Sequence, residues 1–163
     1  MTKTIRLAAA LLTTGLALGA YTAGMAPAGA ATDTVRTQER EIVATASETY
    51  KNELNGECLD DFGALSTYRC DGTDEQDWTV TRWNDGTVRF KNADTGDCLS
   101  DSGGTLGTDN CNTSESQSFW IKHWNDGTMR FKNQATGQCV EADNDSDVWS
   151  STSCDSSQSQ SWY

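Results

Sequence analysis

The sequence has few basic residues, and this scarcity limits what the protein can bind. Its 163 residues include 12 lysines and arginines against 24 aspartates and glutamates, a formal net charge of −12. Without Lys3 and Arg6, the two basic residues at the start of the chain, the net charge becomes −14. Nucleic acids and anionic lipid surfaces are bound through clustered lysine and arginine side chains. The composition therefore predicts no nucleic-acid partner and no membrane partner.

The chain also lacks the groups on which metal and acid–base chemistry depend. His123 is the sole histidine and no Cys-x-x-Cys pair occurs, which argues against a zinc site. A calcium loop starting at Asp143 would need glycine at its sixth position and glutamate at its twelfth, and has neither. Asp60 and Asp61 are adjacent, so in a strand their side chains face opposite ways, unlike the two carboxylates of a glycosidase. We expect no catalytic residue, no metal and no cofactor.

Long apolar runs are missing except near the start of the chain. Residues 7–20 form an apolar run that follows Lys3 and Arg6 and precedes a series of small residues ending at Ala31. This is the pattern of a secretory signal peptide, and the alternative, a membrane anchor, would need a longer run. We expect residues 1–30 to be a signal peptide and the protein to be secreted and extracellular. Residues 31–48 are interpreted as a partly mobile N-terminal leader, with a linker, a short helix or a strand as alternatives.

The most informative stretch occurs twice. Residues 83–92 read WNDGTVRFKN and residues 124–133 read WNDGTMRFKN, so nine of ten positions match at an offset of 41 residues. An Asp-Gly step between alternating strand-like segments indicates a tight hairpin turn, because glycine adopts positive φ without a steric cost. A repeat of about 40 residues is typical of repeated β architectures.

Three repeats can be traced over one domain, residues 49–163. Each begins with an aromatic residue, lysine and asparagine, continues with Gly-x-Cys and an aliphatic residue, and reaches a second cysteine 12, 13 or 15 residues later. Each then has Gln-x-aromatic. The repeats span residues 50–89, 90–130 and 131–163.

The six cysteines predict a disulfide framework in an exported domain, and sequence alone allows 15 pairings. Each repeat contains two cysteines, so pairing within repeats uses one local geometry three times. We therefore expect the bonds Cys58–Cys70, Cys98–Cys111 and Cys139–Cys154.

About four short strands are expected in each repeat, roughly 12 in all. In the second repeat they lie near residues 87–92, 97–100, 106–110 and 118–124. The third repeat ends at Tyr163 without an Asn-Asp-Gly turn. If the three repeats close into a ring, which would remove exposed sheet edges, residues 47–50 should pair with residues 161–163.

The repeat also predicts the core, because equivalent apolar positions should form threefold layers. By default such buried aromatic positions are core rather than ligand platforms. The expected layers are Leu59, Leu99 and Val140, and Trp78, Phe119 and Trp162.

The chain has three units, and each contains a cysteine pair and a Gln-x-Trp motif or a close variant of it. Together they resemble the ricin B-type lectin family. The motifs are Gln76-Asp77-Trp78, Gln117-Ser118-Phe119 and Gln160-Ser161-Trp162. The resemblance covers the chain after residue 48, and it implies an all-β β-trefoil of three pseudo-threefold repeats. Two departures are Phe119 in place of tryptophan and a short stretch between the paired cysteines.

The resemblance also implies where a sugar would bind. In this family an aspartate after the Cys-aliphatic pair accepts hydrogen bonds from sugar hydroxyls, and an aromatic residue two before the second cysteine stacks on the sugar face. An asparagine–glutamine pair at the start of the Gln-x-Trp motif completes the family's site. The first repeat has Asp60, Tyr68 and Gln76 at these positions, with Glu75 in place of the asparagine. The alternatives are a solvated acidic loop at Asp60 and Asp61, and an ordinary half-buried strand residue at Tyr68. Glutamines with a purely structural role are a further alternative: Gln76, Gln117 and Gln160.

The other repeats fit this site less well. The second has Ser100 and Asp109 where the first has its acid and its aromatic residue. The third has Glu141 and Thr152, with Trp149 nearby but out of register.

The sequence thus predicts a secreted, non-catalytic module that binds a neutral oligo- or polysaccharide. The alternative is a β-trefoil scaffold that binds a protein partner or acts as an inhibitor, with degenerate sugar sites.

Overall fold

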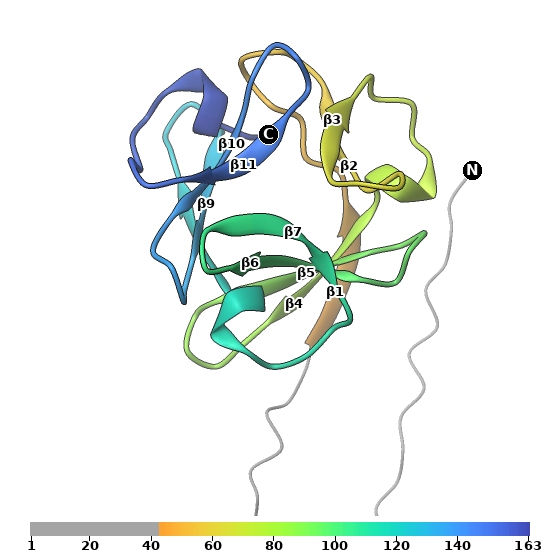
Figure 1. Ribbon diagram of the computed structural model, residues 1–163, viewed down its shortest axis with the longest axis vertical. Coiled ribbons are helices and arrows are strands. Elements are labelled where there is room, and N and C mark those ends of the chain that lie inside the picture. Colours follow the sequence, from red (N-terminus) through yellow and green to blue (C-terminus); the bar gives the residue numbers. More distant parts are fainter. Residues whose placement is uncertain (1–42) are drawn as a thin grey trace, which may run out of the picture. The chain divides into compact units, whose positions relative to one another are not determined.

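The computed structural model describes residues 43–163, and side chains from residue 47 onward (Figure 1). The predicted signal peptide, residues 1–30, and the predicted leader up to residue 42 lie outside the described residues. Val43–Glu48 form strand β1, so the strand alternative holds for this part of residues 31–48. The sheet thus begins ahead of residue 49.

Eleven strands and three short 3₁₀ turns make up the described residues. The first repeat contains β2 (Cys58–Asp60), β3 (Ser66–Tyr68), η1 (Asp74–Gln76) and β4 (Trp78–Arg82). The second contains β5 (Val88–Asn92), β6 (Cys98–Ser102), β7 (Thr105–Asp109), η2 (Glu115–Gln117) and β8 (Phe119–His123). The third contains β9 (Met129–Asn133), β10 (Cys139–Ala142), β11 (Val148–Ser151) and η3 (Gln158–Gln160).

The duplicated decapeptide forms the hairpins that lead from one repeat to the next. β4 pairs with β5 and β8 pairs with β9, both antiparallel, and each turn contains the Asn-Asp-Gly step. Gly86 and Gly127 have φ of 89° and 93°, a region that disfavours any residue with a Cβ. In the first turn Asp85 accepts hydrogen bonds from the Thr87 backbone N–H and hydroxyl, at 3.0 and 2.7 Å. The same aspartate–threonine contacts recur in the second turn, so the hairpin prediction is confirmed.

The start of the first repeat and the end of the third do meet, but the predicted register is wrong. Residues 47–48 pair with β4 rather than with the C-terminus, because β1 covers the edge of β4 that β5 leaves open. The contact with the C-terminus comes later, where Lys51 and Tyr163 exchange backbone hydrogen bonds of 3.2 and 2.9 Å. Asn52 also bridges to Trp162. The ring therefore closes through residues 51–52.

A threefold aromatic cluster fills the centre. Tyr50, Phe90 and Phe131, the aromatic residues that open the repeats, lie with ring centroids 4.9–5.3 Å apart. Both predicted layers are confirmed: every member is 0–1 % exposed (Leu59, Leu99, Val140, Trp78, Phe119 and Trp162). Burial of this apolar surface is the main stabilising contribution to such a fold.

An asparagine in each repeat is held by the repeat before it. The Asn92 side-chain amide donates to the Glu75 carbonyl at 2.7 Å, and Asn133 donates to the Ser116 carbonyl at the same distance. Asn52 of the first repeat completes the set by donating to Ser159 of the third at 2.9 Å. These bonds join three consecutive repeats into a closed ring.

Each repeat carries one disulfide, as predicted: Cys58–Cys70, Cys98–Cys111 and Cys139–Cys154. Each bond closes a loop of a dozen or so residues, which in the chain-entropy model contributes about 3 kcal/mol. The all-β, threefold arrangement with one disulfide per repeat is the predicted β-trefoil.

Candidate functional site

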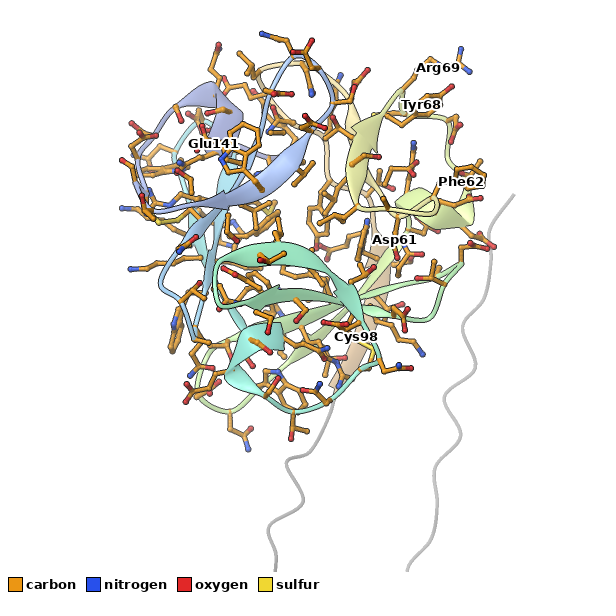
Figure 2. All side chains as sticks on the ribbon, viewed as in Figure 1. Asp61, Phe62, Tyr68, Arg69, Cys98 and Glu141 are labelled. Atoms are coloured by element: carbon orange, nitrogen blue, oxygen red, sulfur yellow. A yellow bond between two sulfur atoms is a disulfide. The ribbon has the colours of Figure 1, made fainter. Side chains whose placement is uncertain are left out.

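The candidate site is built on the short β2–β3 hairpin of the first repeat, shown with its side chains in Figure 2. Asp60 ends β2 and pairs across the hairpin with Ser66, while Tyr68 ends β3. The loop between the strands turns at Gly63, whose φ of 75° suits glycine. This geometry places an acid and an aromatic residue beside one hollow.

The hollow has a volume of about 360 Å³. Its lining consists of three acids, two hydroxyl residues and two aromatic residues: Asp60, Asp71, Glu75, Ser66, Thr73, Phe62 and Tyr68.

Gln76 lies behind the hollow and positions Asp60. The Gln76 side chain is 0 % exposed, and its Nε2 donates to Asp60 Oδ2 at 3.1 Å and to the Arg69 carbonyl at 3.0 Å. Its Oε1 accepts a hydrogen bond from the Asp71 backbone N–H at 3.0 Å. The whole amide is thereby used within the protein. Among the predicted site residues, Gln76 is the one that does not line the hollow.

The other repeats show that this glutamine has a structural task throughout. Gln117 Oε1 accepts from the Asn112 N–H at 2.7 Å, and Gln160 Oε1 accepts from the Asp155 N–H at 3.0 Å. In both cases the glutamine Nε2 also donates to a backbone carbonyl near the second cysteine. The structural alternative for the glutamines is therefore observed in all three repeats.

Asp60 is buried, so the alternative of an exposed acidic loop is wrong at this residue. Only 5 % of it is exposed, and its Oδ1 accepts a hydrogen bond from the Phe62 N–H at 2.9 Å. A carboxylate has about four acceptor positions, so the contacts with Phe62 and Gln76 leave capacity for a ligand. Asp60 is thus a fixed acceptor at the wall of the hollow.

Tyr68 and Phe62 are the two aromatic side chains of the hollow. They are 56 % and 77 % exposed, and Figure 2 shows both on the same flank of the molecule. Single exposed rings are common, but exposed apolar side chains grouped around a hollow are typical of ligand-binding sites. Sequence reasoning missed Phe62, although a comparison of repeats would have singled it out, because Ser102 and Asp143 stand at its equivalent positions.

Glu75 contributes both structure and charge. Its backbone carbonyl accepts from the Asn92 amide at 2.7 Å and from the Asp61 N–H at 3.1 Å, which fixes η1 against the second repeat. Glu75 is also one of the residues that line the hollow, so an acidic residue stands there on a fixed backbone.

Asp61 has a different task from its neighbour Asp60. It is 3 % exposed and accepts hydrogen bonds from the hydroxyls of Thr95 at 2.7 Å and Thr108 at 2.8 Å, both in the second repeat. Burial raises the pKa of the Asp61 carboxyl, and the two threonine hydrogen bonds oppose this increase. The two adjacent carboxylates are therefore held by different repeats.

The second and third repeats depart from the first. Ser100 takes the place of Asp60 and is 3 % exposed, so the second repeat has no acid there. In the third, Glu141 accepts from Gln160 Nε2 at 2.9 Å, as Asp60 does from Gln76. Trp149, 38 % exposed, lies directly opposite Glu141 across the strand pair. Its register differs from that of Tyr68, which lies opposite Cys58.

Two further observations concern metal ions and membrane-spanning helices. Within residues 43–163, histidine, cysteine and acidic side chains form no group of three or more arranged to hold a metal ion. Over the same residues, no helix has the length and apolarity needed to span a membrane.

The sequence matches a family model described as the ricin-type beta-trefoil lectin domain, over residues 46–162. No curated protein matches the chain.

Solved structures share the fold at low sequence identity. The designed threefold-symmetric protein ThreeFoil is 17 % identical, with a TM-score of 0.65, covering 71 % of this chain and 95 % of its own. SeviL, solved bound to asialo-GM1 saccharide, is 13 % identical with a TM-score of 0.62, covering 72 % and 94 %. The Haemophilus ducreyi cytolethal distending toxin is 22 % identical with a TM-score of 0.60, covering 70 % and 81 %. These likenesses concern the fold.

Proposed function

This chain belongs to the ricin-type β-trefoil lectin domain family, a family of carbohydrate-binding modules, and from that premise we propose that it binds a saccharide non-catalytically in the hollow of its first repeat. The observation that carries the proposal is the combination, around one hollow, of a held acceptor and two exposed rings. Asp60 is fixed by Gln76, and Tyr68 and Phe62 stand at the rim. A pyranose has an apolar C–H face and a polar edge, which this arrangement can contact together.

The proposal includes secretion and the absence of catalysis. Residues 1–30 have the pattern of a secretory signal peptide, and an oxidising compartment suits three disulfides. Asp60 and Asp61 contact different repeats, so these two adjacent carboxylates are not placed together on one glycosidic bond. Purified protein incubated with the ligand should yield no hydrolysis products.

Affinity for a single sugar should be weak. The hollow is open, so a ligand there buries only part of its surface, and useful avidity would require several sites or several molecules acting together. A Kd in the millimolar range, about −4 kcal/mol, is expected for a monosaccharide.

The test is a calorimetric titration of the mature protein and two variants with a panel of oligosaccharides. Tyr68→Ala should weaken binding by up to about tenfold, because stacking on an aromatic ring contributes about 0.5–1.5 kcal/mol. Tyr163→Ala is the matched control: Tyr163 is also a half-exposed tyrosine, 49 % against 56 %, but it is not part of the hollow. Unchanged binding in Tyr68→Ala would contradict the proposed site. Absence of binding by the unmodified protein to any saccharide would favour the protein-binding alternative.

A further inference from the structure

The charged residues that line the hollow of the first repeat are all acidic. Asp60, Asp71 and Glu75 are three of its seven residues, and the other four are uncharged. No lysine or arginine belongs to this lining. The sequence predicted a neutral ligand, but a neutral sugar offers no positive charge to these three carboxylates. A preference for a positively charged ligand would specify the proposed function further, and the inference rests on that function.

The protein uses these carboxylates only in part. Asp71 Oδ1 accepts one hydrogen bond, from the Thr73 N–H at 3.2 Å, and Asp71 is exposed. Asp60 accepts one hydrogen bond on each oxygen. Among residues 43–163, we find no hydrogen bond to the Glu75 carboxylate, although its backbone carbonyl accepts two. Ionised carboxylates only accept hydrogen bonds, so the ligand must supply the donors.

The aromatic rings of Tyr68 and Phe62 also favour a positively charged ligand. Tyr68 and Phe62 are 56 % and 77 % exposed, and the face of an aromatic ring carries negative charge density that attracts cations. An ammonium group offers three donors and a positive charge. A carboxylated or sulfated sugar would be repelled by the three lining carboxylates.

One basic side chain lies near enough in the sequence to be considered. Arg69 follows Tyr68 directly, but it is not part of the lining, and Figure 2 shows its side chain beyond Tyr68, on the side away from Phe62. Arg69 is exposed, where solvent and salt screen its charge. It therefore does not neutralise the hollow.

We propose that the hollow of the first repeat selects saccharides carrying a free, protonated amino group over the same saccharides with that group acetylated. The aromatic rings hold the apolar face of the sugar, while Glu75, Asp71 and Asp60 receive its ammonium group and hydroxyls. The ligand class is thus an amine-bearing glycan.

A matched pair of ligands tests this selectivity directly. The protein is titrated with glucosamine oligomers and with N-acetylglucosamine oligomers of equal length, at the same pH and salt. The free-amine ligand should bind about tenfold more tightly, the sum expected from an exposed ion pair and a cation–π contact. Its affinity should also decline more steeply as salt is added.

A matched pair of variants separates recognition from the general attraction of an acidic protein for cations. Glu75→Gln should weaken binding of the free-amine ligand about fivefold and leave the acetylated ligand nearly unchanged. Glu115→Gln removes the same charge from an exposed position on η2 of the second repeat and should leave both ligands unchanged. Circular dichroism confirms that both variants are folded.

The outcomes distinguish this inference from the proposed function. Equal or tighter binding of the acetylated ligand overturns the selectivity but leaves carbohydrate binding in place. Equal losses in the two glutamine variants also overturn it, because the attraction would then come from net charge. If neither ligand nor any other saccharide binds, both the inference and the proposed function are rejected.

Discussion

At the scale of single residues, neighbouring side chains of the same type have unrelated tasks. Asp60 is held by the first repeat's own glutamine and faces the hollow, whereas Asp61 is bonded to two threonines of the second repeat. Asp60 is the last residue of β2 and Asp61 is the first residue of the loop that follows. One acid therefore belongs to the candidate site and the other to the junction between repeats.

Asp60→Asn should impair both binding and stability. An asparagine can accept with one oxygen only, so either the Phe62 N–H or the Gln76 Nε2 loses its acceptor. We expect unfolding to require about 1–3 kcal/mol less, as is typical for an unsatisfied buried donor. Denaturant titration measures this, and sugar binding is measured where both proteins are folded. Asp109→Asn, an exposed acid of the second repeat, is the control; equal stability of Asp60→Asn and the unmodified protein would contradict the description of Asp60.

Asp61 and Asp126 should give pH dependences of opposite sign. The pKa of Asp61 is raised by burial, so its stabilising contribution is complete below the unfolded pKa and is lost as pH rises through the folded pKa. The penalty of Asp61→Asn should therefore be largest in acid and shrink toward neutral pH. The pKa of Asp126 is lowered by its hydrogen bonds from Thr128, so its contribution is present above the unfolded pKa and lost as pH falls.

Unfolding titrations of both asparagine variants between acidic and neutral pH measure these slopes. The penalty of Asp126→Asn should be present at neutral pH and vanish in acid. Parallel slopes for the two variants would contradict the assigned environments.

At the scale of elements, the sequence was most informative where a local pattern repeats. The turns after Trp83 and Trp124 could be predicted because aspartate, glycine and threonine satisfy the turn among themselves. The pairing of β1 with β4 could not, because strand partners far apart in sequence are chosen by which sheet edge stays open.

The candidate site was predictable to a similar degree. Asp60 and Tyr68 lie beside one hollow as family spacing implied. The internal use of the Gln76 amide and the exposure of Phe62 depend on the packing of a loop, for which sequence periodicity carries no information. The one available indication of Phe62 was the comparison of repeats, because the equivalent residues, Ser102 and Asp143, are not aromatic.

Removing β1 should destabilise the sheet. A chain beginning at residue 49 loses the pairing with β4 and the 2.8 Å hydrogen bond from the Tyr50 hydroxyl to Glu48, compared with a chain beginning at residue 43. We expect a loss of about 1–3 kcal/mol, together with greater self-association through the exposed edge of β4. Thermal melting and size-exclusion chromatography provide the two measurements. Identical behaviour of the two chains would mean that β1 contributes nothing to the fold.

At the scale of the whole molecule, the three repeats are similar in structure and different in surface. All three share the core layers, the disulfide and the glutamine that closes the loop, because each of these is needed to bury the centre. The acid and the aromatic residues of the hollow are not needed for that purpose, and they vary. Binding capacity can therefore differ among repeats without cost to the fold.

A fragment containing any two repeats should not fold. Each two-repeat chain would lack one of the three members of every core layer and would lose two of the three asparagine contacts. Far-ultraviolet and near-ultraviolet circular dichroism of residues 43–130 should show an unfolded chain, with the full domain as control. A fragment with a sharp melting transition would contradict this expectation.

The ring of asparagine contacts has a consequence for how the molecule opens. In a linear array of repeats the terminal units have one neighbour each and can unravel first, which produces partly open forms. Here Asn52 is held by Ser159, so the first and last repeats are neighbours and no unit occupies an end. Loss of any one repeat withdraws support from both others at once. Slowly exchanging backbone amides in all three repeats should therefore become exposed together, through a single global transition rather than by fraying.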